Sequence, residues 1–143
     1  MQLHDLLPVT DNPTAADLSE LDDRINAFNA HRTSIHDARY LSIMLRSDDG
    51  DLYAGLHGHT WGGGCEIKLL WVAEDRRGQG LGARLLQSAE VEAARRGCRL
   101  ALLATHSFQA PGFYQRHGFS RIATVDGYPA GHAEIFMMKV LSR

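Results

Sequence analysis

An apolar strand, an amphipathic helix and a second apolar strand follow one another in the middle of this 143-residue sequence. The segment Cys65–Ala73 leaves almost no polar face, which predicts a central strand that is covered on both sides. Over residues 79–96 the apolar side chains fall within one arc of a helical wheel, and Arg99–Thr105 is again strongly apolar. This succession predicts two parallel strands joined by a right-handed crossover helix.

The segments around this crossover complete the expected architecture. Upstream, alternating residues in Leu41–Leu45 and Leu52–Trp61 predict an antiparallel hairpin that turns at Gly50. The remaining predictions are a short strand within Gln2–Val9, a helix over residues 15–30 capped by Thr14, a helix over Gln109–His117, and strands over Phe119–Val125 and Glu134–Leu141. The expected fold class is α/β: a mixed central sheet with an antiparallel N-terminal half, one parallel strand-helix-strand crossover and helices on both faces.

The apolar residues of the first helix and of the crossover helix recur at helical spacing, which predicts core positions for Leu18, Leu21, Ile25, Phe28, Leu85 and Leu86. The sequence shows no repeat and no linker that would mark a domain boundary. We therefore expect residues 1–143 to form a single domain.

Composition excludes several classes of function. With 15 Lys+Arg against 17 Asp+Glu the net charge is −2, so the basic face of a nucleic-acid-binding protein is not expected. The sequence has no long apolar stretch and no basic leader, which predicts a cytoplasmic protein without membrane contact. We expect Cys65 and Cys98 to be reduced core residues. His57 and His59 share a strand face but have no third ligand nearby, so no metal site is expected.

The segment from Arg77 to Gly82 lies where the first parallel strand passes into the crossover helix. The N–H groups at the start of a helix have no intrahelical acceptor, and glycines let an anion approach closely, so this junction suits a pyrophosphate. The nucleotide-triphosphatase pattern G-x-x-x-x-G-K-[ST] is absent. Gly78–Ala83 does fit the relaxed dinucleotide pattern G-x-G-x-x-A, although Arg99–Thr105 ends without the acidic residue that would bind a ribose hydroxyl.

Two motifs resemble those of the GNAT superfamily of N-acetyltransferases. Arg77-x-x-Gly80-x-Gly82 matches the acyl-CoA signature [QR]-x-x-G-x-[GA], and Ala110–Tyr114 followed by Gly118-Phe119 looks like the segment after the second parallel strand. The resemblance covers about residues 40–141. One position departs from it, because family members often carry Asn where this chain has Ser107, which could instead cap the helix at Ala110.

The resemblance implies a binding site for acetyl-CoA without a metal. Backbone groups of Trp71 and Val72 would pair with the pantetheine arm, which requires a gap between the strand ending at Val72 and the one ending at Thr105. The pyrophosphate would be held by the loop and first helical turn, namely Arg77, Gly78, Gln79, Gly80, Leu81 and Gly82.

Two residues carry the implied chemistry. Tyr114 would be the general acid that protonates the departing CoA thiolate, and its alternative is a core tyrosine. Glu66 would be the general base, and its alternative is a surface carboxylate paired with Lys68. His106 or a water molecule remain open as the base, while Tyr40, His57, His59, Trp61, Tyr128, Pro129 and His132 are candidates to line the acceptor pocket.

The resemblance thus implies an N-acetyltransferase that transfers an acetyl group from acetyl-CoA to a primary amine by direct attack in a ternary complex. Neither cysteine has a neighbouring histidine, which argues against a covalent acyl-enzyme. The alternatives are a non-catalytic acyl-CoA-binding sensor on the same fold and a nicotinamide-dependent oxidoreductase. The acceptor, a small-molecule or peptide amine, and the acyl chain length stay open. We also expect that the chain can form a homodimer through its apolar C-terminal strand.

Overall fold

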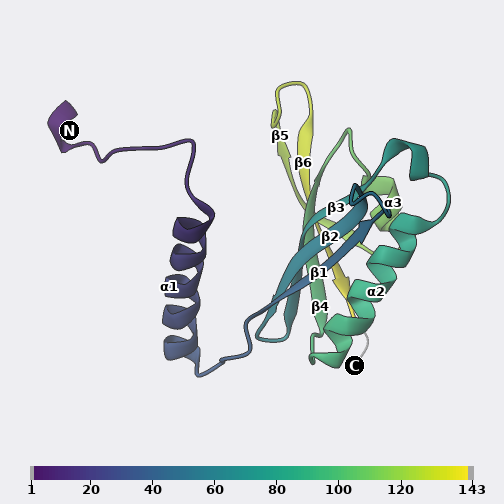
Figure 1. Ribbon diagram of the computed structural model, residues 1–143, viewed down its shortest axis with the longest axis horizontal. Coiled ribbons are helices and arrows are strands. Elements are labelled where there is room, and N and C mark those ends of the chain that lie inside the picture. Colours follow the sequence, from purple (N-terminus) through teal and green to yellow (C-terminus); the bar gives the residue numbers. More distant parts are fainter. Residues whose placement is uncertain (1, 142–143) are drawn as a thin grey trace. The chain divides into compact units, whose positions relative to one another are not determined.

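The computed structural model describes residues 2–141 and divides into two compact units, one up to Ile35 and one from His36 onward. The first unit contains a one-turn 3-10 helix, Leu3–Asp5, and the long helix α1, Ala15–Thr33 (Figure 1). The Thr14 hydroxyl accepts a hydrogen bond from the Asp17 N–H over 3.0 Å, which confirms the predicted N-cap.

One prediction for this first unit is wrong. Gln2–Val9 contains the 3-10 helix instead of a strand, because three alternating apolar residues do not make a strand without a neighbouring strand to bond to. Within this unit alone, the apolar side chains of α1 that were predicted as core are each more than half exposed: Leu18, Leu21, Ile25 and Phe28. A helix cannot bury an apolar stripe by itself, so periodicity alone did not decide their burial.

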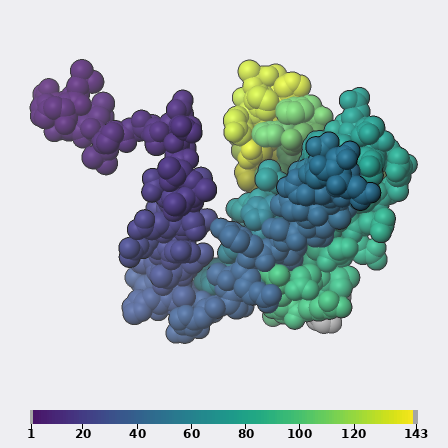
Figure 2. Space-filling model, in the orientation of Figure 1, coloured from purple at the N-terminus to yellow at the C-terminus, as the bar shows by residue number. Residues whose placement is uncertain are grey.

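The second unit is a six-stranded sheet with strand order β1-β2-β3-β4-β6-β5. Its strands are β1 (Arg39–Arg46), β2 (Leu52–Trp61), β3 (Gly64–Val72), β4 (Leu100–His106), β5 (Ser120–Asp126) and β6 (Ala133–Val140). Within this sheet β3 and β4 are parallel and the other neighbouring strands are antiparallel. In Figure 2 the β5–β6 hairpin, in yellow and yellow-green, forms one end of the unit's surface. The predicted α/β fold class and its parallel crossover are confirmed.

The crossover helix α2, Leu81–Arg95, packs on one face of this sheet and buries the side chains predicted for it, Leu85 and Leu86. The short helix α3, Pro111–Arg116, joins the same core through Tyr114. Burying one leucine side chain stabilises a fold by about 1.5–3 kcal/mol, so this core holds α2 firmly against the strands. The start of α2, where the candidate site lies, is therefore fixed relative to β3.

The sequence predicts a β3 that is covered on both sides, and the second unit by itself covers one of its faces. Its burial alternates, and Leu69 and Trp71 are 67% and 47% exposed. The strand is central in the sheet, but α2 covers one face of it. The C-terminal strand β6 is also not an edge strand, since it lies between β4 and β5. The edge strands of this sheet are β1 and β5.

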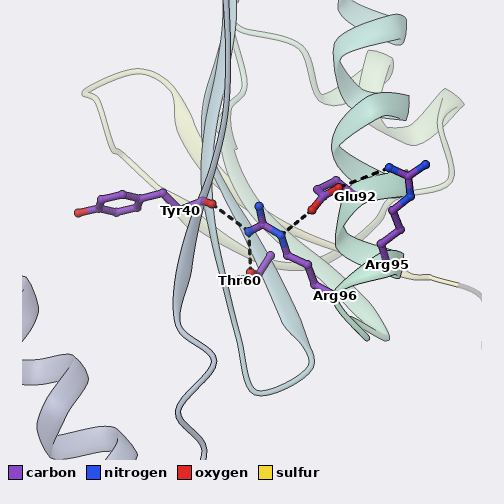
Figure 3. A network of polar contacts seen from close by, with 5 residues as sticks. All are labelled: Tyr40, Thr60, Glu92, Arg95 and Arg96. Atoms are coloured by element: carbon purple, nitrogen blue, oxygen red, sulfur yellow. Dashed lines mark hydrogen bonds and ion pairs between the residues drawn. The ribbon is translucent and has the colours of Figure 1, made fainter.

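Arg96, directly after α2, ties the end of the helix to the sheet (Figure 3). Its side chain is 13% exposed, and its Nη1 donates to the Tyr40 carbonyl over 2.9 Å and to the Thr60 hydroxyl over 3.0 Å. Its Nε donates to the Glu92 carboxylate over 2.9 Å. Because Tyr40 and Thr60 lie on β1 and β2, this one guanidinium joins three elements.

Candidate active site

The two parallel strands separate before they end. The β3–β4 ladder pairs Gly64–Ile67 with Leu100–Leu103, and the pairing stops there. Beyond that point Lys68–Val72 of β3 and Ala104–Thr105 of β4 line a cleft of about 850 Å³. The predicted gap between the strand ending at Val72 and the one ending at Thr105 is confirmed. On its β4 side, β3 has no strand partner in this gap, as an added extended chain would require.

The cleft ends at a glycine-rich turn between β3 and α2. Gly78 and Gly80 have φ angles of +79° and +78°, a region that side-chain-bearing residues rarely adopt. A Cβ atom added at either position would meet no other atom within 4 Å, so these glycines are required by backbone conformation and leave open space above the turn. Gly80 caps α2 without a side-chain hydrogen bond. The first N–H groups of α2 are therefore available to an anion.

Arg77 connects this turn to the preceding strand, since its Nε donates to the Val72 carbonyl over 2.9 Å. Arg77 and the two residues predicted to pair with the pantetheine arm, Trp71 and Val72, all line the cleft. So do four of the five predicted turn residues, Gly78, Gly80, Leu81 and Gly82. Gln79 is not part of the lining.

Tyr114 lies on α3, lines the cleft and is 8% exposed. Its ring packs edge-on against Phe113 and Phe119, with centroid distances of 5.2 Å and 5.8 Å. Burial raises the pKa of the Tyr114 phenol above its ordinary value. The hydroxyl therefore keeps its proton at neutral pH, which is the state that a general acid needs.

Glu66 lies on β3, and the structure does not bring it into the lining of the main cleft. Its carboxylate forms an ion pair with the Lys68 ammonium over 2.8 Å, with both side chains about half exposed. It lines a smaller hollow together with His59 and Trp61. Lys68 itself lines the main cleft. The surface pairing that the sequence offered as the alternative for Glu66 is present.

Ser107, where family members often carry Asn, ties β4 to the β5–β6 hairpin. Its hydroxyl accepts from the Ala133 N–H over 3.0 Å, and its own N–H donates to the Ala133 carbonyl over 2.8 Å. The expectation that Ser107 caps the helix at Ala110 is wrong, because α3 begins without a side-chain cap. Sequence reasoning also missed Gln109, which lines the cleft and accepts from the His106 N–H over 2.7 Å.

The two histidines of β2, His57 and His59, contact side chains of β1. His57 Nδ1 lies 2.6 Å from the Ser42 hydroxyl, and the Tyr40 ring lies near both His57 and His59, with centroid distances of 5.3 Å and 6.5 Å. Among residues 2–141 no three His, Cys, Asp or Glu side chains are placed to hold a metal ion. None of the helices described is both long and apolar enough to cross a membrane.

Comparison with known proteins agrees with this geometry. Residues 40–121 match the family model described as an acetyltransferase (GNAT) domain. The chain is 38% identical over 117 residues to an acetyltransferase of Agrobacterium fabrum, covering 82% of this chain and 85% of the relative. It is 38% identical over 125 residues to blasticidin-S acetyltransferase of Streptomyces morookaense, covering 84% of this chain and 92% of that relative.

The fold has a close counterpart among solved structures. The crystal structure of an acetyltransferase from Bacillus cereus superposes with a TM-score of 0.74 at 30% identity, covering 94% of this chain and 98% of that chain. The family model spans more than half of the sequence and includes the cleft walls, the glycine-rich turn and Tyr114. The chain therefore belongs to the GNAT superfamily of acetyltransferases.

Proposed function

We propose that this protein transfers an acetyl group from acetyl-CoA to a primary amine, by direct attack of the amine on the thioester in a ternary complex. The observation that carries the proposal is the cleft between β3 and β4, which runs from Lys68–Val72, where β3 no longer pairs with β4, to the open glycine turn at the start of α2. An extended arm with a pyrophosphate at one end matches both parts.

The residues of the cleft fit the three parts of acetyl-CoA. The pyrophosphate would lie at Gly78–Gly82, where the helix dipole and unbonded N–H groups favour an anion. The pantetheine arm would lie along Trp71 and Val72. The thioester would then lie between the strands, where Tyr114 enters the lining from α3.

The proposed step is balanced by two proton transfers. The amine nitrogen forms a bond to the thioester carbonyl carbon, the C–S bond breaks, and Tyr114 donates its proton to the departing thiolate. The amine loses a proton to a base, for which Glu66, His106 and a water molecule are the candidates. The raised pKa of Tyr114 supports its role, since the phenol remains protonated until the thiolate forms.

The two cysteines support direct transfer over a covalent acyl-enzyme. Cys65 is buried in the core, and desolvation raises the pKa of its thiol to about 11. Burial also raises the pKa of Cys98. Because the thiolate is the nucleophile, neither residue is activated at neutral pH.

Calorimetry with acetyl-CoA and a thiol-release assay with a panel of primary amines test the proposal. We expect acetyl-CoA to bind and at least one amine to release CoA thiol. Gly80→Glu places a carboxylate in the turn and should abolish binding, while Gly50→Glu is a matched control. Gly50 also has a positive φ and open space around it, but it lies in the β1–β2 turn.

The outcomes separate the alternatives. Failure of acetyl-CoA to bind, or binding that survives Gly80→Glu, would contradict the proposed cofactor site. Tight binding of acetyl-CoA without thiol release for any amine would indicate an acyl-CoA-binding sensor instead of an enzyme.

A further inference from the structure

Gln109 lines the cleft from the segment that joins β4 to α3, and its side-chain oxygen is bonded to the end of β4. The Gln109 Oε1 accepts from the His106 N–H over 2.7 Å and from the Thr105 hydroxyl over 3.4 Å. Thr105 is 4% exposed, and His106 is the last residue of β4, so the strand fixes the position of both donors. The Gln109 amide group is therefore held in place against β4.

These bonds also decide which way the Gln109 amide faces. A backbone N–H can only donate, so the atom that it meets is the amide oxygen, and the NH2 group takes the other position of the amide. Among residues 2–141 no acceptor is bonded to this NH2 group. The side chain is exposed and lines the cleft, so the NH2 group is an oriented donor that is open to a ligand.

The place of Gln109 along the cleft indicates which part of a ligand this donor would meet. The later turn of α3 adjoins the glycine turn, because a Cβ atom at Gly82 would lie 3.5 Å from the Phe113 ring, and the His117 ring lies 4.7 Å from that ring. Gln109 precedes α3 and is bonded to β4 beyond Leu103, where the pairing with β3 has ended. Gln109 therefore belongs to the β4 side of the gap between the strands and not to the glycine turn.

We propose that the Gln109 NH2 group donates a hydrogen bond to an amide carbonyl oxygen of the pantetheine arm. An extended arm beside β3 turns some of its amide groups toward β3 and the others toward β4, and a carbonyl without a donor in the cleft would be costly. The His106 N–H is already bonded to Gln109, so the side-chain amide offers a donor in its place. This assignment of Gln109 as a binding residue rests on the proposed function.

Gln109→Glu removes the donor and keeps the acceptor. The carboxylate can still accept from His106 and Thr105, but it has no hydrogen to give to the arm. We expect the affinity for acetyl-CoA, measured by calorimetry on the full chain, to fall about tenfold. The matched control is Gln115→Glu, which places the same charge at an exposed position of α3 outside the cleft lining and should leave the affinity unchanged.

Two further ligands show which part of acetyl-CoA the donor meets. The first, 3′-phosphoadenosine 5′-diphosphate, is CoA without its arm, so Gln109→Glu should bind it as the native chain does. The second is CoA itself, which has the arm amides but no thioester, and it should lose the same affinity as acetyl-CoA. A loss confined to acetyl-CoA would mean that the NH2 group meets the thioester oxygen, and it would overturn the assignment to the arm.

Gln109→Met separates the lost donor from the added charge. Methionine is neutral and has no donor, so the same loss of affinity for acetyl-CoA and CoA is expected, and thermal melting without ligand verifies that each variant is folded. Unchanged affinity for acetyl-CoA in Gln109→Met, or an equal loss for the arm-free ligand in both variants, would overturn the proposal. If the native chain binds no acetyl-CoA, the proposed function and this assignment fail together. If it binds acetyl-CoA and both variants bind it equally well, the assignment alone fails.

Discussion

Arg77 donates a hydrogen bond from Nε to the carbonyl oxygen of Val72 over 2.9 Å, so the residue that opens the glycine turn also holds the end of β3. Both residues line the cleft. The position of the strand end and the position of the anion-binding turn are therefore linked through one side chain. Charge at residue 77 alone cannot replace this link, because lysine lacks the planar donor group.

Arg77→Lys should lower the affinity for acetyl-CoA about tenfold, since it keeps the charge but loses the Nε hydrogen bond to Val72. Calorimetric titration measures the change. Arg84→Lys makes the same exchange at an exposed position of α2 outside the cleft lining and should have no effect. An unchanged affinity in Arg77→Lys would mean that residue 77 acts by charge alone.

Gly80→Ala and Gly82→Ala should change stability in opposite directions. Gly80 has a φ of +78°, and alanine there costs about 1–2 kcal/mol of left-handed strain. Gly82 lies inside α2, where a Cβ would make an ordinary contact with Phe113 at 3.5 Å, so alanine should stabilise the helix by about 0.5–1 kcal/mol. Urea denaturation measures both values. Equal destabilisation by the two variants would contradict the conformational argument.

Arg96→Met should destabilise the second unit by about 1–3 kcal/mol, because the buried Thr60 hydroxyl and the Tyr40 carbonyl would lose this donor. Arg95→Met is the control. Arg95 is 75% exposed and lies 3.8 Å from Glu92, an arrangement worth about 0–1 kcal/mol. Denaturant unfolding of both variants gives the comparison, and equal losses would mean that the network in Figure 3 does not hold α2 to the sheet.

The same network predicts a pH dependence. The hydrogen bond from Arg96 lowers the pKa of Glu92 below its ordinary value of about 4.3. Because the folded-state pKa is depressed, the stabilisation is present above the ordinary pKa and is lost as the pH falls through the folded-state value. Glu92→Gln should therefore weaken the acid-induced decrease of the melting temperature. A melting series from neutral to acid pH on both proteins measures this, and identical curves would contradict it.

Most of the second unit could be predicted from the sequence, because its signals are local and strong. The period of the residues around Leu85 and Leu86 changes from that of a strand to that of a helix, and glycines mark the turns. The exposure of Leu69 and Trp71 could not be predicted, since an apolar run does not show how many of its faces are covered. The prediction of a strand within Gln2–Val9 was wrong, because a strand needs a partner strand to bond to and local alternation does not show whether one is present.

The candidate site also has one part that the sequence predicted and another that it did not. The glycine turn and Tyr114 belong to motifs, so the sequence predicted their place in one cleft. Gln109 belongs to neither motif, and it lines the cleft because β3 and β4 separate before they end. The hydrogen bonds of Ser107 to Ala133 depend equally on the return of the hairpin to the end of β4. Interactions between strands distant in sequence are thus the part that required the structure.

Tyr114→Phe tests the proposed acid. The phenyl ring preserves the packing against Phe113 and Phe119, so the affinity for acetyl-CoA should change little. The kcat should fall about a hundredfold or more, because the thiolate would leave without a proton donor. In the native protein, burial raises the pKa of Tyr114 above its ordinary value of about 10. The kcat should therefore decline only above that pH, as Tyr114 loses its proton. This decline should be absent from Tyr114→Phe.

Tyr53→Phe removes a hydroxyl from β2, where the ring lies under Arg76, and is the matched control for this measurement. Its kcat should equal that of the native protein. Steady-state thiol release gives kcat and its pH profile, and calorimetry gives the affinity. If Tyr114→Phe kept the native kcat and its alkaline decline, Tyr114 would be a core residue that packs α3 against β5, and the proton for the thiolate would come from solvent.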